Sequence, residues 1–398
     1  MDETPPPRSY LLVVLGGASY CLLMFVWFAL SAFLTPMTDD LGLTSTQAGL
    51  LVGAVPLTYV PLSLSSGLVV DRVGPLRAIG AGTVLFGLAQ VLRGVAPDYP
   101  TMLALTVLLG VGATAVTFGL PKLVSELFPA SRVGTLSTVY LLGSYVGTAA
   151  AFVARPTLGP ALGGWRPTFV ASGLVTLAFA GLWAVVSWWF SAPRFGDDGP
   201  APSVRRDLTR VLSHGELRLL VVVGSGYLFV MHGLQGWLPA VLESRGLTPA
   251  LAGGVATGFV VARVVGTLVV PPLSDALAKR RAPVVACGAL TALGCAGLVS
   301  TAAPVWGAAL AVAVCGVGVG GVAPLVRALP TEMEGIGPRL TATAVGLVFA
   351  VGEVGGFVAP LLVGAARDLT GGFAPGLLAL ALAGASMALA GAFLSDPV

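Results

Sequence analysis

Charge is the scarcest property of this 398-residue chain. Charged side chains make up 10% of the sequence and hydrophobic residues 56%, and the mean hydropathy is +0.93. Soluble domains carry about 25% charged residues, so a soluble fold could not cover this much apolar surface with so few polar groups. The composition excludes a soluble globular protein. It also gives no basic patch for nucleic acid, because the formal net charge is only +3.

Residues that bind metals or act as nucleophiles are also rare. The four cysteines stand singly in apolar runs without metal-ligand spacing: Cys21, Cys287, Cys295 and Cys315. We therefore expect small core residues and neither a disulfide nor a zinc site. His214 and His232 are the only histidines, too few for the Ser/His or metal constellation of a membrane-embedded enzyme. The sequence thus predicts no enzymatic activity, no cofactor and no metal.

What the chain has is a series of apolar runs long enough to cross a bilayer. Runs of about 20 residues predict transmembrane helices. Twelve candidate spans lie near 11–37, 46–70, 78–96, 100–121, 134–155, 167–190, 218–241, 250–273, 282–301, 304–327, 340–363 and 373–394. The one long hydrophilic segment follows the sixth span. We therefore predict an N-terminal six-helix bundle (1–190), a cytoplasmic linker (191–217) and a C-terminal six-helix bundle (218–398).

The distribution of basic residues predicts the orientation of the spans. With the N-terminus placed in the cytoplasm, fifteen of the twenty-one Lys and Arg residues fall on the cytoplasmic side, five fall outside, and Arg263 lies within a span. This bias predicts that both termini are cytoplasmic. Residues 1–9 lack the basic start and cleavage site of a signal peptide. We expect a multi-pass protein of the inner or plasma membrane, present as a monomer in the lipid bilayer.

A short charged turn joins the second and third spans. It reads Gly-x-x-x-Asp-Arg-x-Gly-x-x-Arg, and its members are Gly67, Asp71, Arg72, Gly74 and Arg77. A turn within lipid would leave backbone groups without hydrogen-bond partners, so this segment must lie at a membrane face. The pattern resembles the cytoplasmic loop between the second and third helices of major facilitator superfamily transporters. That resemblance implies a gating role for these residues.

The same layout recurs 204 residues later. Residues 42–71 align without a gap on residues 246–275, and eight of the thirty positions are identical. Asp71 aligns with Asp275, which we add to the candidate gating residues, and the basic turn 279–281 follows. Two similar halves are typical of duplicated transporter folds. The sequence therefore predicts twelve transmembrane helices in two pseudo-symmetric six-helix bundles, the major facilitator fold.

Ionisable side chains at mid-depth mark the candidate substrate site. Arg263 in span eight and Glu353 in span eleven are the two mid-depth charges, and His232 lies in span seven with Gln235 almost one turn on. Such residues cost about 2.5–3.5 kcal/mol to insert and commonly line substrate or ion paths. An Arg263–Glu353 salt bridge that only joins two helices is the alternative for the charges, and His232 could bond a neighbouring helix.

Three aromatic residues complete the predicted substrate contacts. Tyr59 is favoured because the repeat aligns it with Arg263, while Tyr145 and Trp27 lie at depth and could equally serve in packing. Two further arginines, Arg93 and Arg155, lie near the outer ends of helices. Long basic side chains can extend to the membrane surface, so we interpret both as interfacial.

Within the superfamily, the segments 27–51 and 350–360 resemble the opening and the eleventh-helix signature of the cyanate and nitrate/nitrite porters. Three positions depart from that pattern. The second helix lacks the arginine that nitrate porters carry before the Asp-Arg turn, Glu353 stands where their signature has Asn, and Arg263 comes about one turn early. Thr106 replaces the fourth-helix arginine of drug/proton antiporters. The resemblance therefore implies a transporter near the cyanate-porter group without transferring a substrate.

The residues predict a secondary active transporter that moves a small anionic solute by alternating access, coupled to protons. Arg263 would bind the anion through its planar guanidinium, and Glu353 would accept the coupling proton. Two alternatives remain open at this point. One is a carrier of cations, zwitterions or drug-type solutes with Glu353 as the ligand. The other is a membrane receptor that has the fold but does not transport.

Overall fold

The computed structural model describes residues 7–189, 213–300, 305–333 and 336–396. These residues form helices and no strands. The predicted linker 191–217 falls largely outside the described residues. The helices before the linker are α1 (Pro7–Ala32), α2 (Leu34–Leu41), α3 (Ser45–Val73), α4 (Pro75–Gly94), α5 (Tyr99–Leu127), α6 (Ala130–Leu162) and α7 (Trp165–Trp188). The remaining helices are α9 (Gly215–Glu243), α10 (Pro249–Ala276), α11 (Arg281–Gly297), α12 (Val305–Glu332), α13 (Gly337–Thr370) and α14 (Ala374–Gly391).

Each of the twelve predicted spans coincides with a helix, so the all-α membrane fold is confirmed. Ten described helices are long and apolar enough to cross a membrane, and α3 qualifies when its two bent segments count as one span. Helix α11 is apolar but has only 17 residues. The first predicted span, 11–37, differs in detail, because α1 ends at Ala32 and the short α2 follows. Apolar residues continue through this break, so hydropathy gives no sign of it.

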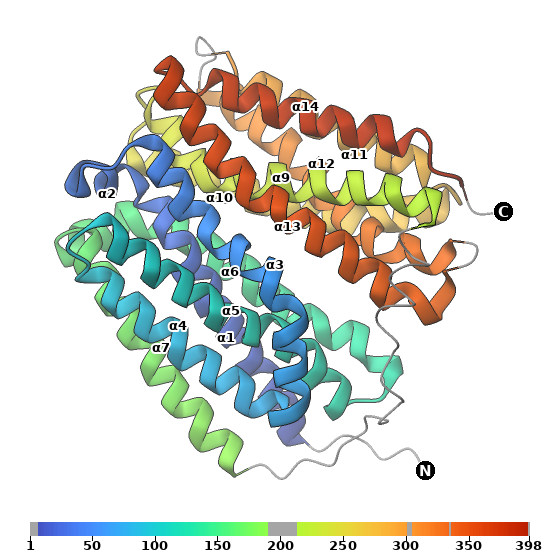
Figure 1. The fold of residues 1–398 in the computed structure, drawn as a ribbon, viewed down its shortest axis with the longest axis horizontal. Helices are drawn as coiled ribbons and strands as arrows, with labels where there is room; N and C mark the ends of the chain where they lie inside the picture. Colours follow the sequence, from blue (N-terminus) through green and yellow to red (C-terminus); the bar gives the residue numbers. More distant parts are fainter. Residues whose placement is uncertain (1–6, 190–212, 301–304, 334–335, 397–398) are drawn as a thin grey trace. The chain divides into compact units, whose positions relative to one another are not determined.

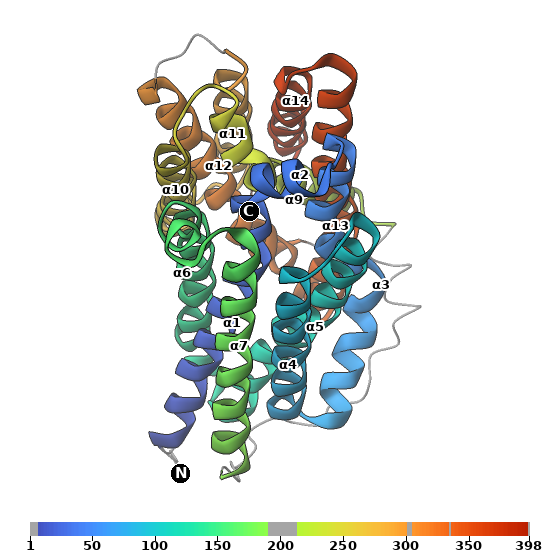
Figure 2. The same ribbon diagram turned by 90° about the vertical axis from the view of Figure 1, so that its left-hand side faces the viewer.

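Contacts divide the chain into two compact units. Unit 1 comprises residues 1–42 and 61–199, and unit 2 comprises residues 43–60 and 200–398. The helix α3 contributes its first part to unit 2 and its second part to unit 1. In Figure 1 the helices before residue 190 are coloured blue to green and those after residue 212 yellow to red, and Figure 2 shows the same ribbon turned by 90°.

Small residues allow close helix packing within unit 1. Helix α1 packs along α6, and α4 packs between α5 and α7. A Cβ atom at Gly143 would lie 2.2 Å from the carbonyl oxygen of Gly17, and one at Gly147 would lie 2.0 Å from that of Cys21. Only glycine fits at such distances, because the backbones themselves are in contact. The glycine-rich composition, which would suggest loops in water, here builds helix interfaces.

Unit 2 uses the same device around α12. This helix packs against α10 and α11, while α9 packs against α13 and α14. A Cβ atom at Gly320 would lie 2.1 Å from the carbonyl oxygen of Arg263, and one at Gly266 would lie 2.2 Å from that of Val317. The carboxylate of Asp368 accepts hydrogen bonds from the first backbone N–H groups of α3, at 2.9 Å from Ser45 and 2.7 Å from Thr46. It thereby caps this helix.

One expectation from the sequence is wrong. Arg93 is not interfacial: its side chain is 1% exposed, donates to Gln90 Oε1 at 3.0 Å, and lies 5.1 Å from the centre of the Phe169 ring. The four cysteines are free thiols, and the Sγ atoms of Cys295 and Cys315 lie 3.6 Å apart, a contact that the sequence did not indicate. Hydropathy sets the depth of a residue but not which neighbouring helix covers it, so neither contact could be anticipated.

Candidate functional site

One face of α9 carries the polar side chains of the candidate site. Tyr227, Met231 and Gln235 follow one another at intervals of four residues, and His232 is adjacent. This spacing places Tyr227, Met231 and Gln235 on one helix face over two successive turns, with His232 about 100° round the helix from Met231. Tyr227, His232 and Gln235 are buried, with 4%, 5% and 1% of their surface exposed. A buried polar face in a membrane helix needs partners on neighbouring helices.

Arg263 of α10 bonds to this face of α9. Its Nη1 donates to Gln235 Oε1 at 2.7 Å, and its Nη2 lies 3.3 Å from the Met231 sulfur. The guanidinium carbon also lies 5.9 Å from the centre of the Phe259 ring, at the edge of cation–π range. Gln235 and Met231 are neutral acceptors, so these contacts orient the guanidinium without neutralising its charge.

Glu353 of α13 has a different partner. Its Oε2 lies 3.4 Å from His232 Nε2, and the two side chains are 15% and 5% exposed. Gly356 makes room for this pair, because a Cβ atom there would lie 2.7 Å from the His232 ring and 3.0 Å from Glu353 Oε2. The structure thus pairs Glu353 with His232, whereas the sequence suggested Arg263 as its partner. Arg263 and Glu353 thus contact neighbouring residues of the same helix, α9.

The structure brings together only part of the predicted substrate set. Arg263, Gln235, His232 and Glu353 join α9, α10 and α13 in unit 2, and Tyr59 is a buried residue of the same unit. Trp27 and Tyr145, by contrast, belong to unit 1. Both are half-buried, and the rings of Trp27 and Phe28 stack with their centres 5.4 Å apart.

Sequence reasoning missed Met231 and Tyr227. The Tyr227 hydroxyl lies 3.3 Å from the Met231 sulfur, which also contacts Arg263. Met231 and Tyr227 lie four and eight residues before Gln235, and this helical spacing is the sequence signal that could have placed them on the same face.

The Asp-Arg turn lies in unit 1. Gly74 adopts φ +84°, a conformation that favours glycine, and it ends α3 directly before Pro75 starts α4. Asp71 forms an ion pair with Lys122 of α5. Arg72 and Arg77 are exposed, and Gly67 has open space around it. Asp71 therefore has a cationic partner within its own unit, which the sequence did not identify.

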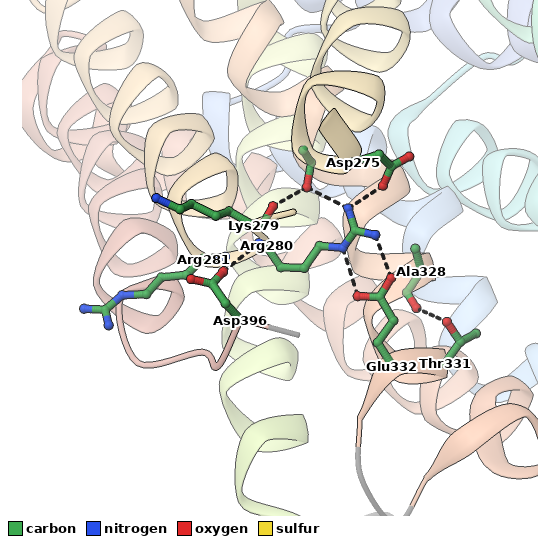
Figure 3. Close-up of polar contacts among 9 residues, drawn as sticks. Asp275, Lys279, Arg280, Arg281, Ala328, Thr331, Glu332 and Asp396 are labelled. Carbon is green, nitrogen blue, oxygen red and sulfur yellow. Dashed lines mark hydrogen bonds and ion pairs between the residues drawn. The ribbon is translucent and has the colours of Figure 1, made fainter. Parts of the chain in front are cut away.

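The second turn, in unit 2, is organised by Arg280 (Figure 3). Its guanidinium donates to both carboxylate oxygens of Glu332, at 2.9 and 2.7 Å, and to Asp275 at 2.5 Å. It also donates to the buried Ser274 hydroxyl at 2.8 Å. Hydrogen bonds to Glu332 and Asp275 raise the pKa of Arg280 above its ordinary value. Asp275, which aligns with Asp71 in the repeat, thus also has a cationic partner, although here the cation lies in the turn.

The C-terminal segment is attached to this second turn. The carboxylate of Asp396 accepts from the backbone N–H groups of Arg280 and Arg281 at 2.7 and 2.9 Å, and so caps the start of α11. Ser395 donates its N–H to Glu216 at the start of α9, at 3.1 Å. The backbone hydrogen bonds from Arg281 and Arg280 lower the pKa of Asp396. Residues 395–396, the α10–α11 turn and the end of α12 at Glu332 therefore share one face, which we call the turn face.

No group of three or more metal-binding side chains occurs in the part of the chain that the structure describes. The site consists instead of single charges set in long apolar helices, repeated turns with ion pairs, and glycine-mediated helix contacts. Ionisable residues in this setting mark solute paths through membranes. Fold and site together define a multi-pass membrane transporter.

The sequence matches the Major Facilitator Superfamily over residues 17–360. The chain belongs to this superfamily, and it is a transporter and not an enzyme. It is 30% identical over 353 residues to the 3-(3-hydroxy-phenyl)propionate transporter of Escherichia coli K12, covering 86% of this chain and 84% of the relative. It is 27% identical over 387 residues to the nitrite extrusion protein of Bacillus subtilis 168, covering 94% and 91%.

A solved structure shares the fold. The bacterial homolog to the human lysosomal transporter Spinster, in an inward-facing and unoccupied conformation, superposes with a TM-score of 0.75 at 18% identity, covering 98% of this chain and 95% of that one. This likeness concerns the fold alone. The expected membership near the nitrate/nitrite porters is confirmed by the similarity to the nitrite extrusion protein.

Proposed function

We propose that this protein is a secondary active transporter that moves a small organic or inorganic anion by alternating access, coupled to protons. The observation that carries the proposal is the arrangement around α9. Arg263 is held by the neutral Gln235 and Met231, while Glu353 lies beside His232. An oriented guanidinium suits the two oxygens of a carboxylate or a planar oxyanion.

The relatives support an anionic substrate. Their names include a transporter of 3-(3-hydroxy-phenyl)propionate, a nitrite extrusion protein and a putative tartrate transporter. The substrates in these names have a negative charge in common and differ in size and in apolar content. The neighbours of Arg263, a thioether and the Phe259 ring, favour an anion with an apolar body over one that is polar on every side.

The His232–Glu353 pair is the proposed proton carrier. Imidazole and carboxyl groups can both carry a proton, and these two lie side by side at 3.4 Å between α9 and α13. In this scheme the anion does not have to displace Glu353 from Arg263, because Arg263 and Glu353 have separate partners. The coupling then depends on α9, which provides both of those partners.

The proposal includes the arrangement in the membrane. Both termini face the cytoplasm, so the turn face is cytoplasmic, and the protein lies in the plasma membrane as a monomer. The two six-helix bundles, 1–190 and 218–398, move relative to each other around the substrate. The turn residues Asp71 and Asp275 act on that movement and not on substrate affinity.

Uptake into proteoliposomes tests the function. Purified protein is reconstituted with 3-(3-hydroxyphenyl)propionate, nitrate or tartrate outside, and with a pH gradient that is acidic outside. We expect accumulation of at least one anion by the wild type and none by Arg263→Lys, because lysine keeps the charge but loses the planar fork. Arg281→Lys is the control, since the Arg281 side chain is exposed and points away from the cluster in Figure 3.

Glu353→Gln separates coupling from binding. This variant should still exchange anion across the membrane, because the amide resembles the neutral acid, yet it should not accumulate anion in response to the gradient. Accumulation equal to the wild type would show that the pair is not the proton carrier. A solute cation that requires Glu353 but not Arg263 would favour the cation or zwitterion carrier. Absence of flux for every anion and cation would favour a receptor.

A further inference from the structure

Arg327 of α12 is a second cation near the candidate site, in addition to Arg263. Its side chain is exposed, and its guanidinium carbon lies 4.6 Å from the centre of the Phe349 ring on α13. Its Nη1 donates to the Ala323 carbonyl one turn earlier in its own helix, at 2.9 Å. Among the described residues, Arg327 takes part in none of the ion pairs, whereas the nearby Arg280 has two.

The position of Arg327 relates it to both the turn face and Glu353. It lies five residues before Glu332, the last residue of α12, which corresponds to about 7.5 Å along the helix axis. Phe349 precedes Glu353 by four residues on α13, so both lie on the same helix face about one turn apart. Arg327 thus rests on the ring that is next to the proton-carrying carboxylate, on the side of the turn face.

The contact with Phe349 is informative because a simpler arrangement was available. An arginine about one and a half turns from a helix end can extend to the membrane surface, where its charge is hydrated. In Arg327 the guanidinium carbon lies 4.6 Å from the centre of an aromatic ring on the neighbouring helix, within the range of cation–π attraction. Its N–H groups are the part that binds carboxylates and planar oxyanions.

We propose that Arg327 and Phe349 form a second anion-binding subsite, which receives the anionic group of the substrate between the turn face and Arg263. This inference rests on the proposed function and deepens it by defining a two-step path. The ligand class is a small carboxylate or oxyanion. An exposed cation without a carboxylate partner also raises the local anion concentration at the entrance.

The test compares transport from the two membrane faces. Arg327→Gln and Phe349→Leu are reconstituted beside the wild type, with Arg281→Gln as a matched control for a lost exposed arginine. The initial rate of 3-(3-hydroxyphenyl)propionate or nitrate flux, whichever the wild type carries, is measured against concentration on each side. A C-terminal tag reports the turn face, because Asp396 is bound to that turn.

We expect Arg327→Gln to raise KM about fivefold on the turn face, and this fivefold change corresponds to about 1 kcal/mol. On the opposite face the rise should be less than about twofold. Phe349→Leu should have a smaller effect in the same direction, and Arg281→Gln none. High salt should reduce the difference between Arg327→Gln and the wild type, because about 1 M salt shortens the Debye length to about 3 Å.

Equal KM values for the wild type and both variants would overturn the subsite. An equal rise on both faces would also overturn it, since it would indicate damage to the central site. If Arg327→Gln does not fold, Phe349→Leu carries the same comparison without removing a charge. The proposed function fails separately, when the wild type carries no anion. The subsite alone fails when the wild type transports, Arg263→Lys does not, and Arg327→Gln is normal.

Discussion

Arg280 should contribute more to the stability of unit 2 than any neighbouring basic residue. Three of its side-chain nitrogens donate hydrogen bonds, to Glu332, Asp275 and Ser274. The Arg280 side chain is 15% exposed, while Glu332 is 30% and Asp275 is 65% exposed. Its partners thus range from the buried Ser274 hydroxyl to a largely hydrated carboxylate. The contacts must therefore be weighted by exposure.

The magnitude follows from this weighting. The exposed Asp275 pair contributes about 0.5 kcal/mol, the two-bond contact with Glu332 about 1–1.5 kcal/mol, and the bond to the buried Ser274 about 1 kcal/mol. Arg280→Ala should therefore cost about 2–3 kcal/mol. Arg280→Lys should cost roughly half of that, since an ammonium cannot span both carboxylates. Arg281→Ala should change stability by less than about 0.5 kcal/mol.

Thermal unfolding of the purified protein measures these effects. For a unit of 150–250 residues, a loss of 2–3 kcal/mol lowers Tm by about 4–12 °C. A double-mutant cycle with Glu332→Gln should give a coupling energy near 1 kcal/mol. Arg280→Lys with wild-type Tm would refute the reasoning. So would an equal loss in Arg281→Ala, because any basic residue in the turn would then serve.

Three further predictions concern other residues. Asp71→Asn removes the charge that pairs with Lys122, so it should slow transport several-fold while anion binding, measured by thermal shift, stays within about twofold; equal losses would argue against gating. Because the Asp396 pKa is lowered, Asp396 stabilises the folded state fully above the ordinary aspartate pKa of about 3.9, and this stabilisation is lost as pH falls through the lowered value. Asp396→Asn should therefore reduce the fall in Tm at acid pH. A dependence of Tm on pH equal to that of the wild type would contradict the cap. Gly147→Leu should prevent folding, seen as aggregation in size-exclusion chromatography, because its Cβ would meet Cys21 at 2.0 Å; a monodisperse variant would disprove the tight contact.

The helices could be predicted from sequence because the bilayer imposes their length. Twenty apolar residues span the hydrocarbon core whatever their neighbours are, and all twelve predicted spans coincide with helices. The break after Ala32 could not be predicted in this way, since Phe33 and Leu34 are as apolar as the helix itself. Hydropathy reports depth and length but contains no information on local backbone geometry.

The contacts that Arg263 and Glu353 make depend on how helices far apart in the sequence pack together. Arg263 and Glu353 stood out because mid-depth charges are costly. Which residue each one contacts depends on how α9 is rotated between α10 and α13. Gly356 of α13 leaves room for His232 of α9, and Gly320 of α12 allows the close approach of α10 at Arg263. The Cys295–Cys315 contact was missed for the same reason, because Gly294 sets the approach of α11 to α12.

The separate partners of Arg263 and Glu353 constrain how transport could be coupled to protons. If the two residues formed one pair, an anion could release Glu353 simply by displacing it from Arg263. In the structure Arg263 bonds to Gln235 and Met231, and Glu353 lies beside His232. These three α9 residues fall within five consecutive positions. On the proposed mechanism, a shift of α9 that follows anion binding would therefore move His232 relative to Glu353. The helix between the charges would then link anion binding to the proposed proton carrier, without a direct exchange of salt-bridge partners.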